Sequence, residues 1–269
     1  MRFAISAIAL LACTSLASAA DLNGSSYGVS LKDDYVAPVY NWTGLYVGGH
    51  VGYAWGDWNG ETCTSGACPG DIWEDPTVGA SIDGWLGGLQ VGANQQFSSF
   101  VVGIEADASW GDLGGSDSIT TKKGSVEWIE DLSIDVFGTV RGRLGFLITP
   151  QLLIYGTGGL AWAKTDLKHT VWHHENKAPY DAITGRASTS EHHIGWAAGV
   201  GGEWMLSRNL TVRAEWVHVD LGDTHYHPDG KTYNFSTGDE SGRLRSDQLN
   251  NVDIKFDVFR VGVNYKFGN

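Results

Sequence analysis

Apolar and polar residues alternate along the final segment of the chain. Every second residue from Phe259 to Phe267 is apolar, and the residues between them are polar or glycine. A period of two predicts a β-strand with one apolar and one polar face. In a soluble sandwich the apolar face lines the core, whereas in a membrane barrel it faces lipid and the polar face lines the lumen. The rest of the sequence has to distinguish these two folds.

Seven earlier segments are also strand-like, and each has about the ten residues that a tilted strand needs to cross a bilayer. With the final segment, the predicted strands are 44–56, 85–97, 100–110, 137–146, 152–163, 194–206, 210–219 and 259–269. Alternation separates an apolar from a polar face in every segment except 152–163. The pattern therefore predicts eight strands.

The connections between these segments alternate in length. The short ones are Ser98–Ser99, roughly 148–151, and 207–209. The long ones are polar and cover about 57–84, 111–136, 164–193 and 221–258. Short turns on one side and long loops on the other are typical of a bacterial outer-membrane barrel, with the turns in the periplasm and the loops outside. A soluble sandwich gives no reason for this sorting.

Aromatic residues mark both ends of the predicted strands. Those nearest the long loops are Trp55, Trp85, Trp110, Trp162, Trp196, Trp216 and Phe259. Those nearest the short turns are Phe97, Phe100, Phe146, Trp204 and Phe267. Two aromatic belts beside an apolar band are expected at two membrane interfaces. We therefore predict that the apolar faces point outward, in an eight-stranded antiparallel transmembrane β-barrel with four long extracellular loops.

The first twenty residues have the features of a secretory signal. Arg2 gives a positive start, residues 4–12 are apolar, and Ala17–Ala19 forms a small-residue cleavage site. Cys13 also fits a bacterial lipoprotein cleavage box, which is an alternative use of the same segment. The predicted organisation is a signal peptide at 1–20, a periplasmic tail at 21–38, and the barrel at 39–269.

Composition and cysteine spacing bear on the class of partner and on the state of two cysteines. The formal net charge is −13, which argues against a nucleic-acid partner because such proteins favour basic surfaces. Cys63 and Cys68 lie five positions apart in a polar segment. In an oxidising compartment this spacing favours a local disulfide over free thiols. A zinc site would need two more ligands nearby, and the sequence offers none there.

Several short motifs resemble one known family. The motifs are VYNWTG at residues 39–44, followed in order by GLQVGANQQF, TVRGRLGF, LIYGTGGLAW, GVGGEW, VRAEW and VGVNYKF. Together they resemble strands of the small outer-membrane immunogenic porins of alphaproteobacteria. The resemblance implies the bacterial outer membrane, contact with its lipid and lipopolysaccharide, and recognition of a terminal strand containing Tyr265 and Phe267 by the barrel assembly machinery. Gly268 and Asn269 follow Phe267, which departs from a C-terminal aromatic residue. The oligomeric state is left open.

The predicted polar faces carry charges of both signs. An eight-stranded barrel has an interior just wide enough for side chains to fill. The expected inward charges are Glu105, Asp107, Glu203, Glu215, Arg141, Arg143, Arg213 and Arg260. Equal numbers of each sign favour a neutralised network, because unpaired charges in such a lumen are unfavourable. We expect a structural, surface-exposed barrel with a plugged lumen; the alternative is a narrow diffusion channel gated by exchange of ion-pair partners.

Histidines in the predicted loops suggest a third function, a surface receptor that binds haem or a metal. The candidates for haem or metal are His173, His174, His225 and His227, because imidazole is a common ligand of both. Polar loops also carry histidines with no ligand, and we expect no cofactor. Ser188 and Ser190 lie near His192 and His193, but the sequence has no hydrolase motif. We therefore expect no enzymatic activity.

Overall fold

The computed structural model describes residues 40–61, 77–120, 126–174, 181–226, 229–233, 240–245 and 249–267. All of them belong to one compact unit, Pro38–Asn269. The predicted signal, the predicted tail, Cys63 and Cys68 lie outside the described residues, so these remain predictions. Among the described residues no helix has the length and apolar character needed to span a membrane.

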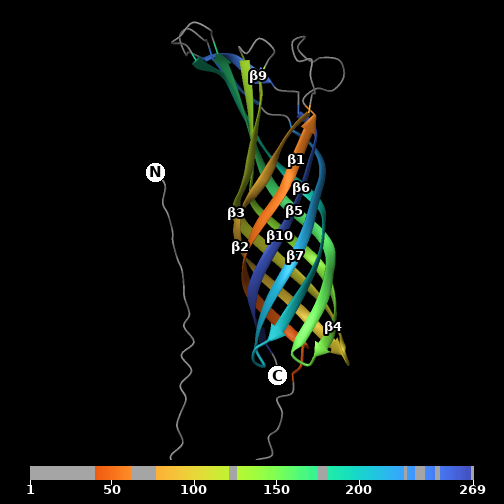
Figure 1. The fold of residues 1–269 in the computed structure, drawn as a ribbon. Helices are drawn as coiled ribbons and strands as arrows, with labels where there is room; N and C mark the ends of the chain where they lie inside the picture. The colour runs from red at the N-terminus through yellow and green to blue at the C-terminus, as the bar shows by residue number, and fades with distance from the viewer. Residues whose placement is uncertain are drawn as a thin grey trace, which may run out of the picture. The chain divides into compact units, whose positions relative to one another are not determined.

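Eight long strands and two short ones make up the described chain (Figure 1). The long strands are β1 (Gly44–Glu61), β2 (Thr77–Phe97), β3 (Phe100–Thr120), β4 (Val126–Thr149), β5 (Leu152–His174), β6 (Asp181–Met205), β7 (Leu210–Tyr226) and β10 (Leu249–Phe267). The short strands are β8 (Asp229–Tyr233) and β9 (Glu240–Arg245).

The eight long strands form a closed antiparallel ring. Each of β1 to β7 pairs with its neighbour in sequence, and β10 pairs with both β7 and β1. The β5–β6 pairing completes the circuit, so none of the eight is left as a free edge within the ring. The short strands extend the sheet beyond the β6–β7 pairing, since β8 pairs with residues 185–188 of β6 and β9 pairs with β8. The prediction of an eight-stranded antiparallel barrel is confirmed.

The strands are much longer than the ten residues predicted from the alternation, so the predicted loop bounds are wrong. The long strands contain 17 to 25 residues. The third predicted loop, 164–193, is strand throughout except for 175–180, which lie outside the described residues. The fourth, 221–258, contains parts of β7 and β10 together with β8 and β9.

The cause of this error is an inversion of polarity along each strand, which β10 shows clearly. From Phe259 to Phe267 the apolar side chains point outward, as predicted. Before that point the apolar residues are buried inside, and the outward positions carry charges. The inward set is Val252, Ile254, Phe256 and Val258, and the outward set is Asp253, Lys255 and Asp257. A pattern of outward apolar residues therefore finds only the lower half of the strand.

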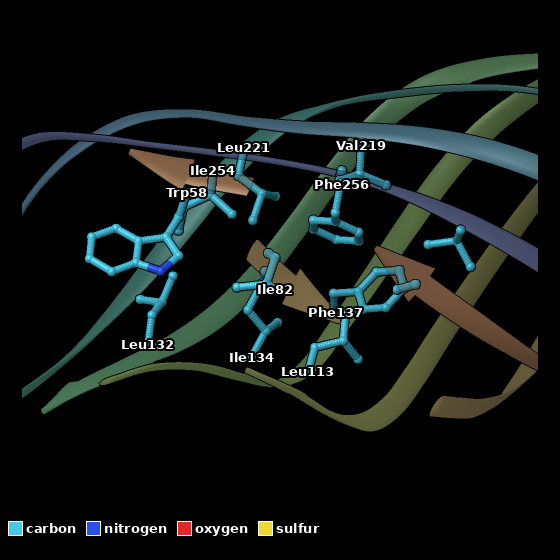
Figure 2. Close-up of a cluster of buried hydrophobic side chains, with 14 of the residues drawn as sticks. Trp58, Ile82, Leu113, Leu132, Ile134, Phe137, Val219, Leu221, Ile254 and Phe256 are labelled. Atoms are coloured by element: carbon cyan, nitrogen blue, oxygen red, sulfur yellow. The ribbon is translucent and has the colours of Figure 1, made fainter. Parts of the chain in front are cut away.

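The upper halves of the strands enclose an apolar core (Figure 2). Its side chains point toward one another across the barrel and are nearly all shielded from solvent. Its larger members are Trp58, Ile82, Leu113, Leu132, Ile134, Phe137, Val219, Leu221, Ile254 and Phe256. In β4 a bulge between Ile134 and Val136 shifts the register, so that both Ile134 and Phe137 face inward. This part of the barrel has the polarity of a water-soluble protein.

The lower halves have the opposite polarity and match the bilayer. Large apolar side chains are exposed on their outer face, including both predicted aromatic belts. Trp85 is 72% exposed and Ile194 is 78% exposed, which is compatible with lipid but unfavourable in water. The strand that alternation did not resolve, β5, points Leu153 and Tyr155 inward and Ile154 outward.

Candidate functional site in the barrel lumen

The structure brings the eight predicted inward charges together inside the membrane-spanning part of the barrel. All eight are buried. They lie on five strands, and the strand register places several of them directly opposite one another. The opposed pairs are Glu105 with Arg141, Arg260 with Glu215, and Glu203 with Arg213.

Arg141 lies at the centre of the larger group of charges. One of its terminal nitrogens is 3.0 Å from Glu105 Oε1 and 3.2 Å from Asp107 Oδ2, and the other is 2.9 Å from Glu215 Oε1. Its remaining N–H groups donate to hydroxyl groups, at 2.9 Å to Thr139 and 2.7 Å to Thr157. One guanidinium thus links β4 to three other strands, β3, β5 and β7, by charge-assisted hydrogen bonds.

Two further arginines share the same three carboxylates. Arg260 contacts Asp107 at 3.2 Å and Glu215 at 2.7 Å. Arg213 forms an ion pair with Glu105 and lies 3.4 Å from Glu215. Three arginines therefore meet three carboxylates, and each carboxylate contacts more than one arginine. The group is neutral as a whole, which is the arrangement that buried charges require.

A second, smaller group lies closer to the short turns. Arg143 forms an ion pair with Glu203 and lies over the ring of Tyr155, 3.7 Å from its centroid, in a cation–π contact. Thr211 donates its hydroxyl proton to Glu203, and Asn264 Nδ2 donates to the same carboxylate at 2.9 Å. This group is also neutral.

Neutral polar side chains that the sequence reasoning left out of the network join the two groups. The Tyr46 hydroxyl donates to Glu105 at 2.6 Å. Gln90 Nε2 donates to Asn264 at 2.6 Å, and His50 contacts Gln90 and Ser109 at 2.6 and 2.9 Å. All of these residues occupy inward positions on predicted strands, so the same alternation that found the charges also carries a signal for them.

Glycines on the inner wall leave room for these long side chains. At Gly52 an added Cβ would lie 2.9 Å from Arg260 Cβ. At Gly48 it would collide with Asn264, and at Gly92 with the Tyr46 hydroxyl. The glycine-rich composition thus has a local cause, because inward side chains on one strand fill the space over the bare backbone of the neighbouring strand.

Apolar layers lie on both sides of the charges along the lumen. Toward the extracellular end is the core of Figure 2. Toward the short turns lies a smaller apolar cluster, formed by Trp42, Val101, Leu153, Tyr155 and Met205. The Trp42 side chain is fixed by its indole N–H, which donates to the Pro150 carbonyl at 3.1 Å, while its backbone N–H donates to Gln96 at 2.9 Å.

Trp42 comes before the first strand and follows no alternation, so the sequence pattern did not identify its role. The residues beside it are also tied to the lower rim of the barrel. Gln151 Nε2 donates to the Tyr40 hydroxyl at 2.5 Å, and Lys266 Nζ donates to the Asn41 carbonyl. Residues 40–42 therefore cross beneath the lumen and are not part of a free tail.

Three of the four histidines proposed for haem or metal lie in strands and not in the predicted loops. His173 and His174 end β5, and His225 belongs to β7, because the strands continue past the membrane. Their side chains and His227 lie outside the described residues. Within the described part of the chain, no group of three or more histidine, cysteine, aspartate or glutamate residues could hold a metal ion.

Two other histidines face the interior of the extracellular half. His169 is buried and its Nδ1 forms an ion-pair contact with Glu130. Burial raises the pKa of the Glu130 carboxyl, and the contact with His169 partly opposes this shift. His193 Nε2 lies 2.9 Å from the Thr165 hydroxyl. These contacts stabilise the walls of the extracellular half of the barrel.

The serines and histidines considered for catalysis are divided between the two sides of β6. Ser188, Ser190 and His192 are on the outer face or its edge, whereas His193 is buried inside. Ser190 donates its hydroxyl proton to Asp166. Of these four residues, only His193 therefore lies on the inner face of β6.

The predicted assembly signal lies at the end of β10. Tyr265 and Phe267 point outward and are about half exposed, with ring centroids 5.1 Å apart in an edge-to-face arrangement. Gly268 and Asn269 lie outside the described residues. Recognition of this strand by the assembly machinery stays a prediction.

Comparison with known proteins agrees with this architecture. The family model described as "Outer membrane protein beta-barrel domain" matches residues 6–267. The 31 kDa outer-membrane immunogenic protein of Brucella melitensis biotype 1 is 31% identical over 238 residues, covering 86% of this chain and 87% of that protein. The 22 kDa outer membrane protein of Rhizobium leguminosarum bv. viciae is 26% identical and covers 78% of each chain.

Solved structures with a similar fold include the attachment invasion locus protein Ail of Yersinia pestis, at 13% identity and a TM-score of 0.35, covering 84% of this chain and 99% of that one. The outer membrane protease OmpT from Escherichia coli is 8% identical with a TM-score of 0.44, covering 86% and 99%. The family model and the Brucella relative, taken with the closed eight-stranded ring, show that this chain belongs to the outer-membrane β-barrel family that includes the immunogenic proteins of Brucella, and that it is a protein of the bacterial outer membrane.

Proposed function

We propose that this protein is a structural barrel of the outer membrane whose lumen does not conduct and whose extended upper half displays a polar surface outside the cell. The observation that carries this proposal is the stacking of a neutral charge network between two apolar layers. An ion that entered from either end would have to cross a layer of buried apolar side chains before it reached the charge network, and desolvation at that point is strongly unfavourable.

The charge network itself also opposes opening. Breaking a buried ion pair by removal of one partner typically costs about 3–5 kcal/mol. Arg141, Arg213 and Arg260 each contact at least two carboxylates. Moving any one of them aside would therefore leave more than one carboxylate short of a cation. We infer that the network fixes the barrel walls.

The extracellular half supports a display role. Its apolar core makes it a continuation of the barrel with its own packing, and its outward positions above the belts are polar. The Brucella relatives carry the name immunogenic protein, which fits a protein whose upper surface is accessible from outside the cell. We propose no catalytic role, because His193 faces the opposite side of β6 from the candidate serines and Ser190 donates its hydroxyl proton to Asp166, not to His192.

A narrow diffusion channel is the second candidate, and one feature favours it. Arg260 lies 3.2, 2.7 and 3.6 Å from Asp107, Glu215 and Glu105 respectively. An arginine this close to three carboxylates has the geometry for exchanging partners. Under this alternative, partner exchange would open a path through the charged layer.

An ion-flux assay in liposomes separates the two functions. Protein purified from outer membranes is reconstituted with a trapped fluorescent indicator, and its folded state is checked by heat-modifiable gel mobility. We expect liposomes that contain the protein to show no more ion flux than protein-free liposomes, and a general porin serves as the positive control. Trp42→Gly opens only the lower apolar layer, and Trp55→Gly on the outer belt is its matched control. Both variants should show no added flux, because the charge network and the upper apolar core remain closed. Flux through the unmodified, folded protein would refute the closed lumen.

A further inference from the structure

A basic pocket lies on the outer wall of the extracellular half, where β8 joins the barrel. Thr170 on β5, Arg186 on β6 and Lys231 on β8 are consecutive partners in one cross-strand row. Lys168 and Ser188 form the neighbouring row, two residues away on the same face, in which Lys168 also lies opposite Asp131 of β4 and Ser188 opposite Asp229 of β8. Both rows therefore present their side chains to the same side of the sheet.

These side chains surround a hollow of about 450 Å³. Its lining includes three cations and three hydroxyl groups, from Lys168, Arg186, Lys231, Thr170, Ser188 and Tyr233, and is completed by His169 and Ala187. The three cations are exposed. Lys231 has an ion-pair partner, Glu240, at 2.7 Å. Among the side chains that the structure describes, neither Lys168 nor Arg186 forms an ion pair with a carboxylate. Cations and hydroxyl donors that converge in this way suit a phosphate-like anion.

The pocket stands out against the charge of the whole chain. The chain has 31 acidic and 18 basic residues, and four of its arginines are neutralised in the lumen. Lys168 and Arg186 are two exposed cations that no described side chain neutralises by an ion pair. Both can therefore contact an anionic ligand.

The height of the pocket indicates which ligand can reach it. Lys168 is six residues beyond Trp162 of the upper belt on β5, or about 20 Å along the strand and about 15 Å along the barrel axis at a tilt near 40°. A phospholipid headgroup layer extends only about 5–8 Å beyond the hydrocarbon. A sugar chain attached to a lipid reaches further, and the pocket opens sideways toward such a neighbour.

We propose that this pocket binds a phosphate group on the core saccharide of a lipopolysaccharide molecule in the same leaflet. Lys168 and Arg186 would supply the charge, and the nearby hydroxyl groups would donate to the phosphate oxygens. A soluble polyanion would have to approach a protein of net negative charge, whereas a membrane-held glycolipid is already at high effective concentration beside the wall. This proposal is independent of whether the lumen conducts.

Titration with purified lipopolysaccharide tests this site. The full chain, purified from outer membranes in detergent, is titrated with fluorescent lipopolysaccharide that carries a phosphorylated core, and with the same material after dephosphorylation. The test variant is Lys168→Gln with Arg186→Gln. The matched control, Arg208→Gln with Lys255→Gln, removes the same charge from exposed positions elsewhere. Heat-modifiable mobility verifies the fold of each protein.

We expect the test variant to weaken binding of the phosphorylated material at least about tenfold, as loss of charge-assisted contacts predicts. Dephosphorylation should have a similar effect on the unmodified protein, and the control variant should bind normally. Equal binding by test and control variants would overturn the proposal, and so would binding that ignores dephosphorylation. Soluble heparin is the comparison polyanion. If the unmodified protein bound heparin tightly but did not bind lipopolysaccharide, and the test variant lost heparin binding, the pocket would belong to a different ligand and our proposal would be refuted.

Discussion

The polarity inversion predicts opposite outcomes for one substitution at two positions on the same strand. Val51 and Asn59 both lie on the outer face of β1, exposed, four residues on either side of Trp55 in the upper belt. Four residues correspond to about 13 Å of strand and about 10 Å along the barrel axis at a tilt near 40°. Since the apolar band is about 25 Å tall, Val51 lies near its middle and Asn59 lies in water.

We therefore expect Val51→Lys to lower the free energy of unfolding by about 2–4 kcal/mol, the usual effect of a lysine at the bilayer midplane. Asn59→Lys should change the same quantity by no more than about 0.5 kcal/mol, as for other surface substitutions. Asn59 lies opposite Asp253, so the added charge meets an acidic neighbour.

Guanidinium unfolding and refolding in lipid vesicles, followed by tryptophan fluorescence, measures both variants. The two proteins share strand, face and substituted residue, so only the environment differs. Similar losses in both variants would refute the inversion of polarity at the belt, and so would a larger loss at Asn59 than at Val51.

Four further predictions concern the interior and one turn. Trp58→Ala should lower the free energy of unfolding by about 3–5 kcal/mol, because it leaves a large cavity in an apolar core; a loss under 1 kcal/mol in the same vesicle assay would contradict that core. Arg141→Met should cost about 3–5 kcal/mol, since it leaves buried carboxylates without a cation; an unchanged midpoint would argue against the network. The raised pKa of Glu130 means that the folded state binds its proton more tightly, so stability should rise as pH falls from neutral toward the ordinary carboxyl range, and Glu130→Gln should remove that rise; a steeper pH dependence in the variant would reverse the sign. Ser98 has a φ of 55°, so Ser98→Gly should stabilise the protein by up to about 1 kcal/mol; destabilisation would mean that its side chain matters to the turn.

Much of the fold was predictable from the sequence because alternation fixes which way each side chain points. Once Val261 and Val263 face lipid, Arg260 has to face the lumen. The same rule placed Arg141 and Glu215 inside, and the structure has both there. The partner of each charge was not predictable, because it depends on the register between strands that are distant in sequence.

The strand lengths could not be found in this way because the meaning of the pattern changes at the belt. Apolar residues such as Ile254 and Phe256 face inward, while Phe259 faces outward, so the alternation is interrupted by two neighbouring apolar residues, Val258 and Phe259. A search for a second alternating segment of opposite phase would have found the extension. Trp42 belongs to no alternating segment, and only the three-dimensional structure reveals its place beneath the lumen.

Single-channel conductance in a planar bilayer tests the closed lumen most directly. Folded protein, verified by its heat-modifiable mobility and by its insertion, is recorded over a range of voltages beside a general porin. The stacked apolar and charged layers predict a silent membrane at every voltage that the bilayer withstands. Discrete and reproducible current steps from the unmodified protein, altered in size or gating by Arg141→Ala, would contradict the closed lumen and establish a channel through the charge network.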